Sequence, residues 1–230
     1  MSASALPALR QELIRQGLDG FIVPRADEHL GEYVPASAER LAWLTGFTGS
    51  AGLAIQGAVI YDAVAADHFD ADTHTADAVA YPLEKRISFT TGLFAWPALA
   101  DTITDTHLVV RDRFGRMVVF LARILHDRVL PGAKTAYALG IDQASAVVVD
   151  PDGTATVLNG TGGRGAYLVR AHAVPDLQPG QPVRYTVEAS HIGHNGARFD
   201  LLRKTTRQPW YSLTVDGSRS PVYSRDPYQP

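Results

Sequence analysis

The sequence predicts an α/β protein in which strands and helices alternate before an antiparallel extension near the carboxyl end. Short apolar runs that end at Gly or Pro alternate with stretches of helical spacing, and strong turn sequences follow them. With 230 residues, of which 46% are hydrophobic and 20% are charged, the chain can bury a sizeable core. This composition excludes wholesale disorder.

The first elements expected are two helices and two strands. Leucine and isoleucine between residues 6 and 14 recur at helical spacing, and Gly17 follows as a helix stop. Residues 20–23 form a short apolar run that a proline ends, which predicts a strand. A short helix capped by Ser37 comes next, and residues 53–60 continue as a second apolar strand.

The middle of the chain predicts one long helix among short strands. Residues 62–82 are acidic and rich in alanine, which is typical of a loop that carries a short helix. An apolar run gives way to polar residues at 103–107, as at the end of a strand. Residues 115–124 keep the apolar spacing of an amphipathic helix, and residues 136–141 and 145–149 read as buried strands.

Hairpin signals dominate the last third of the chain. The turn sequence Asp-Pro-Asp-Gly at 150–153 leads into a strand at 154–158. Residues 183–188 alternate like a strand, and residues 210–215 form a second strand-like run. The segment 219–230 is rich in Pro and Tyr and is expected to form an extended tail or a strap across a partner surface.

Composition narrows the classes of partner. The formal net charge of −3 disfavours nucleic acid and anionic lipid as partners, since both require a basic surface. The sequence contains no run of about 18 apolar residues, so no membrane span is predicted. No signal peptide is visible either, and we therefore expect a cytoplasmic protein. Without cysteine, any chemistry must come from Ser, His, Asp, Glu or Arg, and no cofactor is expected.

Two residues stand out as candidates for nucleophilic catalysis. Ser50 lies among glycines in TGSAG at 48–52, where small neighbours permit the sharp turn that an activated serine needs. A plain tight turn is the alternative reading, and the first glycine of the usual G-x-S-x-G elbow is replaced by Thr48. His107 follows an apolar run and would suit the role of base, although a capped or surface histidine fits the same pattern.

Two further clusters allow ligand binding. Arginines at three nearby positions could hold an acidic substrate through forked hydrogen bonds, or could form a solvated face: Arg111, Arg113 and Arg116. Four alternating residues could chelate a divalent ion but also resemble an exposed acidic loop, so no metal is assigned to them: His68, Asp70, Asp72 and His74.

The start of the chain resembles the N-terminal domain of the Xaa-Pro aminopeptidase (creatinase-like) family. The motifs that carry this resemblance are GLDGFIVP at 17–24, DEHLGEY at 27–33, the Glu-Arg pair at 39–40 and LTGFTGSAG at 44–52. In that family the domain is non-catalytic, supports oligomerisation and shapes access to a metal site elsewhere. The two-metal catalytic domain that should follow is not recognisable here.

From about residue 50 onward, the chain resembles cyanophycinase-type serine peptidases, which are related to dipeptidase E. The motifs are SAGLAIQ at 50–56, ITDTH at 103–107, RDRFGR at 111–116 and GID at 140–142, with a similar tail from residue 199. The resemblance implies a flavodoxin-like, partly parallel sheet flanked by helices, with a C-terminal β-hairpin extension.

The same resemblance implies a set of site residues. Ser50 would be the nucleophile and His107 the base, with Asp77 as the acidic member of the triad. The residues expected to border the substrate site are Asp105, Arg111, Arg113 and Arg116. The family's early strands and its glycine-rich oxyanion turn are replaced here by the aminopeptidase-like stretch.

These resemblances together predict a serine peptidase with an exchanged N-terminus, acting on peptide or aspartyl-peptide bonds. The expected parts are an aminopeptidase-like segment (1–52), a peptidase core (53–175) and a β-rich extension with its tail (176–230). The partner expected is a peptide substrate, and assembly with further copies of the chain is left open. The alternatives are a non-catalytic oligomerisation or substrate-access module of an Xaa-Pro aminopeptidase-like protein, and an inactive chimeric pseudoenzyme.

Overall fold

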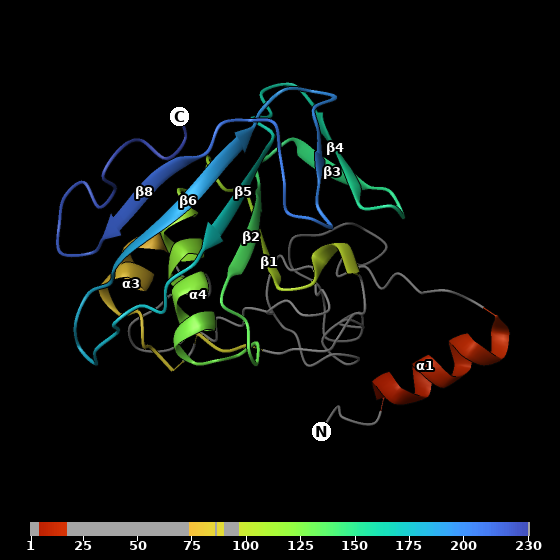
Figure 1. Cartoon of the computed structure of the whole chain (residues 1–230), viewed down its shortest axis with the longest axis horizontal. Helices are drawn as coiled ribbons and strands as arrows, with labels where there is room; N and C mark the ends of the chain where they lie inside the picture. The colour runs from red at the N-terminus through yellow and green to blue at the C-terminus, as the bar shows by residue number, and fades with distance from the viewer. Residues whose placement is uncertain (1–4, 18–73, 86, 90–96, 230) are drawn as a thin grey trace, which may run out of the picture. The chain divides into compact units, whose positions relative to one another are not determined.

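The computed structural model describes residues 5–17, 74–85, 87–89 and 97–229 (Figure 1). The chain divides into two units, Met1–Ser50 and Ala51–Pro230. In the first unit, helix α1 (Ala5–Gln16) ends at Gly17, whose φ of 64° is the left-handed conformation that glycine adopts readily. This confirms the predicted helix and its stop. The strands predicted at 20–23 and 53–60, and the helix at Ser37, lie outside the described residues.

The second unit contains a five-stranded sheet. Its strands, in spatial order, are β1 (Thr102–Thr106), β2 (Ala136–Ile141), β5 (Ala166–Ala171), β6 (Arg184–Ile192) and β8 (Tyr211–Asp216). Strands β1 and β2 pair in parallel, and the other three pairings are antiparallel. The predicted α/β class with a partly parallel sheet is confirmed, and the parallel part is confined among the described strands to β1 and β2.

A smaller sheet contains the predicted hairpin. Strand β3 (Ser145–Val149) pairs with β4 (Thr154–Asn159), and β4 pairs with the short strand β7 (Arg198–Asp200). The turn between β3 and β4 closes through the Asp150 N–H, which donates to the Thr154 carbonyl at 2.8 Å. Gly153 adopts a φ of 87° in this turn, a value that explains the glycine there.

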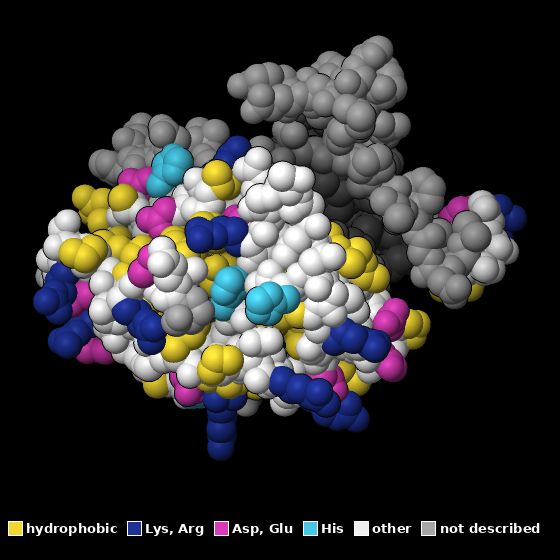
Figure 2. All heavy atoms as spheres, turned by 90° about the horizontal axis from the view of Figure 1, so that it is seen from above, with side chains coloured by type: hydrophobic (Ala, Val, Ile, Leu, Met, Phe, Trp, Pro, Cys, Tyr) yellow, Lys and Arg dark blue, Asp and Glu magenta, His cyan; other side chains and the backbone are white. Residues whose placement is uncertain are grey.

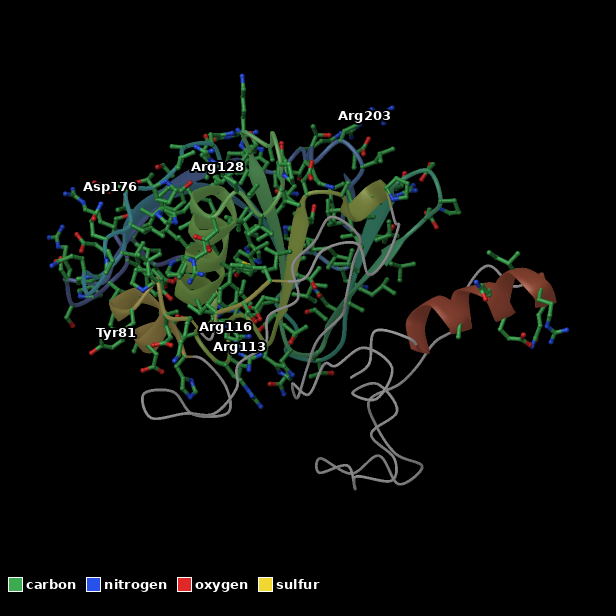
Figure 3. The ribbon with its side chains drawn as sticks, turned by 90° about the horizontal axis from the view of Figure 1, so that it is seen from below. Tyr81, Arg113, Arg116, Arg128, Asp176 and Arg203 are labelled. Atoms are coloured by element: carbon green, nitrogen blue, oxygen red, sulfur yellow. The ribbon has the colours of Figure 1, made fainter. Side chains whose placement is uncertain are left out.

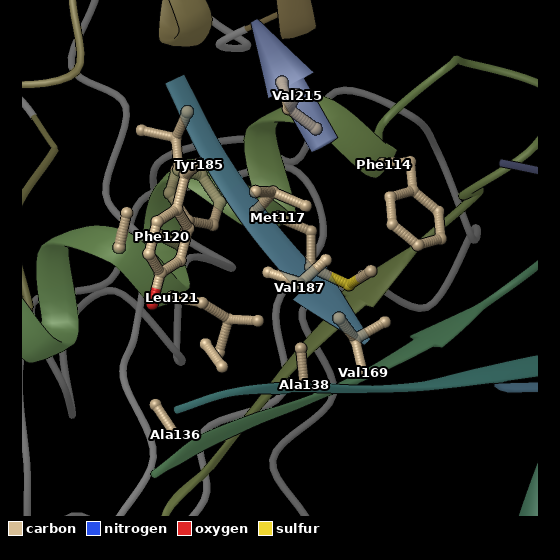
Figure 4. Packing of buried hydrophobic residues seen from close by; sticks show 14 of the residues in the cluster. Phe114, Met117, Phe120, Leu121, Ala136, Ala138, Val169, Tyr185, Val187 and Val215 are labelled. Atoms are coloured by element: carbon tan, nitrogen blue, oxygen red, sulfur yellow. The ribbon is translucent and has the colours of Figure 1, made fainter. Parts of the chain in front are cut away.

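Helix α4 (Phe114–His126) covers one face of the five-stranded sheet, and the short helix α3 (Thr75–Ala80) packs beside it (Figure 1). Every residue of α4 from 114 to 125 is buried. Figure 4 shows Met117, Phe120 and Leu121 of this helix facing strand residues such as Val169 and Val187. The amphipathic spacing predicted this helix, and the sheet buries its apolar face.

Some features differ from the expectation. Strand β5 is buried at five of its six positions. It was not predicted, because a glycine-rich stretch precedes it in the sequence. Strand β7 has only three residues and shows no alternation of its own. The tail, predicted to be an extended tail or a strap across a partner surface, pairs with its own sheet, where Tyr223 forms a bridge with Val215; contact with a partner stays a prediction.

Candidate functional site

The predicted site residues that the structure describes lie around the end of β1 and the start of α4. Strand β1 supplies Asp105, and His107 follows directly after the strand. Arg113 is the N-cap residue of α4, and Arg116 lies in its first turn. Figure 3 shows Arg113 and Arg116 near one another at the end of α4 where the helix begins. The fold therefore brings residues from both sequence motifs together.

Asp105 and Arg116 form a buried, two-pronged ion pair. The Arg116 Nε donates to Asp105 Oδ2 at 2.8 Å, and a terminal nitrogen donates to Oδ1 at 2.5 Å. The Thr106 N–H also donates to this carboxylate at 2.8 Å. Only about a twentieth of each side chain is exposed, at 6% for Arg116 and 5% for Asp105. The pair neutralises two charges inside the protein and leaves neither one open to solvent.

The other two arginines of this motif differ in exposure. Arg113 is buried, and its guanidinium donates to the Thr106 carbonyl at 3.0 Å. Arg111 is exposed and lies in the turn before α4. Arg113 and Arg116 are thus directed toward internal acceptors, so their contact with a substrate stays a prediction.

His107 has an unusual local environment. Its φ of 52° lies in the left-handed region, which is uncommon for a residue other than glycine. The His107 carbonyl accepts a hydrogen bond from the Arg111 N–H, while its buried Nδ1 has no hydrogen-bond partner among the described residues. Asp77 is half-buried on α3. Because Ser50 lies outside the described residues, a Ser50–His107–Asp77 arrangement stays untested.

Two tyrosines of the tail accept hydrogen bonds from the first turn of α4. The Tyr223 hydroxyl accepts from the Gly115 N–H at 3.1 Å and donates to Asp112 at 2.7 Å. The Tyr228 hydroxyl accepts from the Phe114 N–H at 3.2 Å and also donates to Asp112 at 2.7 Å. The first N–H groups of a helix have no partner within it, so these hydroxyls satisfy two of them.

Burial raises the pKa of both Tyr223 and Tyr228, and the nearby Asp112 carboxylate adds to the effect. Both hydroxyls therefore keep their protons at neutral pH and remain donors to Asp112. Thr75 on α3 extends the network, because its hydroxyl donates to the Asp112 carbonyl and accepts from the Arg116 N–H. Sequence reasoning missed these residues; the only signal was the tyrosine content of the tail.

A separate apolar cavity of about 510 Å³ lies between the two sheets. Its walls include Leu139 and Ile141 from β2, Val147 and Val149 from β3, and Leu202. Asp150 is the only charged residue that lines it among the described parts of the chain. No sequence pattern indicated this cavity, because its walls come from segments that are far apart along the chain.

Metal binding and membrane insertion find no support in the described part of the chain. There, no three histidine or acidic side chains are grouped closely enough to hold a metal ion. Of the four residues considered as ligands, only His74 is described. No described helix is long and apolar enough to cross a membrane. On the face seen in Figure 2, described basic and acidic side chains are interspersed. The exclusion of nucleic acid and the cytoplasmic location stay predictions.

Comparison with known proteins decides between the two resemblances. Residues 6–116 match the family model of the Creatinase/Prolidase N-terminal domain. The match covers just under half of the chain. Human Xaa-Pro aminopeptidase 2 is 51% identical over 51 residues, which are 22% of this chain and 8% of the human protein. The pig Xaa-Pro aminopeptidase 2 is 43% identical over 54 residues, or 24% of this chain and 8% of the pig protein.

These findings correct the predicted function. The matched family is that of the aminopeptidase-like resemblance, and its model extends to residue 116, over three of the motifs that had suggested a serine peptidase, at 50–56, 103–107 and 111–116. The cyanophycinase-type resemblance has no support among the relatives, so the serine-peptidase function is wrong. The chain spans less than a tenth of the length of the relatives described above.

Proposed function

We propose that this chain is a non-catalytic module of the Xaa-Pro aminopeptidase N-terminal type. In this role it associates with further copies of itself and shapes the access of peptides to a catalytic site on another domain or chain. The observation that carries the proposal is the match of residues 6–116 to the Creatinase/Prolidase N-terminal domain.

The contacts around β1 and α4 support a module without chemistry of its own. Asp105 is occupied by Arg116 and by the Thr106 N–H, and Arg113 is directed to a backbone carbonyl. Asp112 accepts hydrogen bonds from two tyrosine hydroxyls. A catalytic acid or base must reach a substrate atom, whereas these groups hold β1, α4 and the tail together.

The test combines an activity assay with a measurement of mass. The purified full-length chain is incubated with the peptide Arg-Pro-Pro, with and without Mn²⁺, and human Xaa-Pro aminopeptidase 2 serves as the positive control. Light scattering coupled to size-exclusion chromatography records the mass over a wide range of concentration. We expect no release of arginine, together with a mass that rises with concentration.

Two results would contradict the proposal. Release of the first residue by the pure chain would show that it carries its own catalytic site. A monomeric mass at every concentration would remove the assembly role and would favour an inactive chimeric protein instead.

A further inference from the structure

Strand β3 is an edge of the smaller sheet that no second described strand covers. It lies at the end of the order β3-β4-β7, and β4 is its only strand partner among the described residues. Its sequence, Ser-Ala-Val-Val-Val, contains no charge and no proline, which are devices that usually prevent the pairing of an edge with another chain. Val148 on its outer face is 48% exposed.

The backbone hydrogen bonds show which groups on this edge are open. The Gly160 N–H donates to the Ala144 carbonyl, and the Asp150 N–H donates to the Thr154 carbonyl. The backbone N–H and carbonyl groups of the even-numbered residues of β3 therefore point toward β4. Val157, opposite Val147, uses both its N–H and its carbonyl on the β7 side. The N–H and carbonyl groups of Val147 and Val149 therefore point away from β4, toward the side on which no described strand pairs with β3.

The apolar cavity lies beside this edge. The side chains of Val147 and Val149 form one wall, and Leu139 and Ile141 of β2 belong to its lining. A strand that pairs with β3 presents every second side chain to the same face as these valines. The volume of about 510 Å³ lies within the range of roughly 300–1,000 Å³ typical of ligand pockets.

Charge defines one end of the site. Asp150 follows β3, lines the cavity and is exposed, and its carboxylate makes no hydrogen bond or ion pair with the described residues. A strand that runs antiparallel to β3 has its amino-terminal end beside Asp150. A positive charge at that end of the bound segment would therefore meet an unpaired carboxylate.

We propose that β3 and the adjoining cavity bind an extended segment of another protein by strand addition. The segment runs antiparallel to β3, carries aliphatic side chains at alternate positions and has a basic residue at its amino-terminal end. Main-chain hydrogen bonds to Val147 and Val149 hold it, the cavity takes its aliphatic side chains, and Asp150 fixes its direction. This site is independent of the assembly role proposed above.

The probe for this site is the N-acetylated peptide Lys-Val-Thr-Val-Thr-Val with a fluorophore at its carboxyl end. Its anisotropy is followed during titration with the full-length chain. A second peptide replaces the central Val with Pro, which removes an N–H and disrupts strand pairing. A third replaces Lys with the uncharged norleucine. We expect saturable binding of the first peptide and loss of binding for the proline peptide.

Variants of the protein test the two features separately. Val147→Pro removes an edge N–H that β4 does not use, and we expect it to weaken binding at least tenfold. Asp150→Asn should weaken the binding of the lysine peptide about fivefold and leave the binding of the norleucine peptide unchanged. Val174→Ser is the matched control, because Val174 is exposed and does not line the cavity. Circular dichroism checks that each variant is folded.

Any of three results overturns the proposal: no saturable binding of the lysine peptide, equal binding of the proline peptide, or equal weakening of both peptides by Asp150→Asn. If Val147→Pro does not fold, the comparison of peptides on Asp150→Asn decides alone.

Discussion

Asp105 and Arg116 place two opposite charges where water does not reach them. Removing one partner leaves the other charge buried and uncompensated, which costs far more than the pair itself contributes. We expect Arg116→Met to lower the free energy of unfolding by about 3–5 kcal/mol, as measured by urea denaturation. The double variant Asp105→Leu with Arg116→Met should lose less free energy of unfolding, because neither charge is then buried without its partner. A loss below about 1 kcal/mol in the single variant would mean that water reaches Asp105.

Lys204 is another buried charge. Its Nζ donates to the carbonyls of Ala98 and Leu201 at 2.6 and 2.8 Å, and it lies 5.9 Å from the centre of the Tyr137 ring. Burial lowers the pKa of Lys204 from 10.5 to about 8. Between these two values the unfolded chain holds the proton more tightly than the folded protein does.

This difference in pKa predicts a dependence of stability on pH. Below about pH 8 Lys204 is charged in both states, and the cost of burying the charge is fully present. That cost is relieved as the pH rises from about 8 toward 10.5, by up to about 3 kcal/mol. The free energy of unfolding of the native chain, minus that of Lys204→Met, should therefore rise over this window. A difference that stays constant with pH would show that the lysine keeps an ordinary pKa.

At the scale of elements, the tail and α4 depend on each other. The hydroxyl of Tyr228 joins the Phe114 N–H to Asp112, so Tyr228→Phe leaves both groups without this partner. We expect a loss of about 1–3 kcal/mol in the free energy of unfolding. Tyr137→Phe is the matched control, since its hydroxyl makes no hydrogen bond to the described residues. Equal effects of the two variants would show that the tail does not cap α4.

The contact between α3 and α4 depends on a residue without a side chain. A Cβ atom at Gly115 would lie 2.3 Å from the Thr75 methyl group, and Thr75 is itself held by hydrogen bonds to the Asp112 carbonyl and the Arg116 N–H. Alanine favours a helix by about 1 kcal/mol over glycine, but the clash costs about 1–3 kcal/mol. Gly115→Ala should therefore lower the melting temperature. Gly160→Ala is the control, because its nearest neighbour would lie at 3.4 Å. A higher melting temperature for Gly115→Ala would contradict the packing.

At the scale of the whole molecule, local patterns predicted most elements of the second unit. The helix expected at 115–124 is α4, and the strand at 145–149 is β3, with the predicted turn after it. Periodicity and turn residues act over a few positions, so the sequence alone reveals them. Strand β5 depends on neighbours on both sides, β2 and β6, which come from distant parts of the chain. No local pattern could show that it is central.

The site was harder to predict for the same reason. Asp105 and Arg116 are eleven positions apart and were both expected near one site, but the sequence did not show that they would neutralise each other. Tyr228 meets Asp112 across 116 positions, and the cavity draws on both sheets. Such contacts follow from topology, which the periodicity of single segments does not specify.

The hydrogen bonds of Tyr223 and Tyr228 also have a consequence for limited proteolysis. A protease that cuts the chain after β8 and before Tyr223 would separate both tyrosines from the sheet without cutting a strand or a helix. The first damage would thus be a weakened cap on α4, with the sheet still complete. Resistance to such a cut should rise and fall with the time that the tail spends docked.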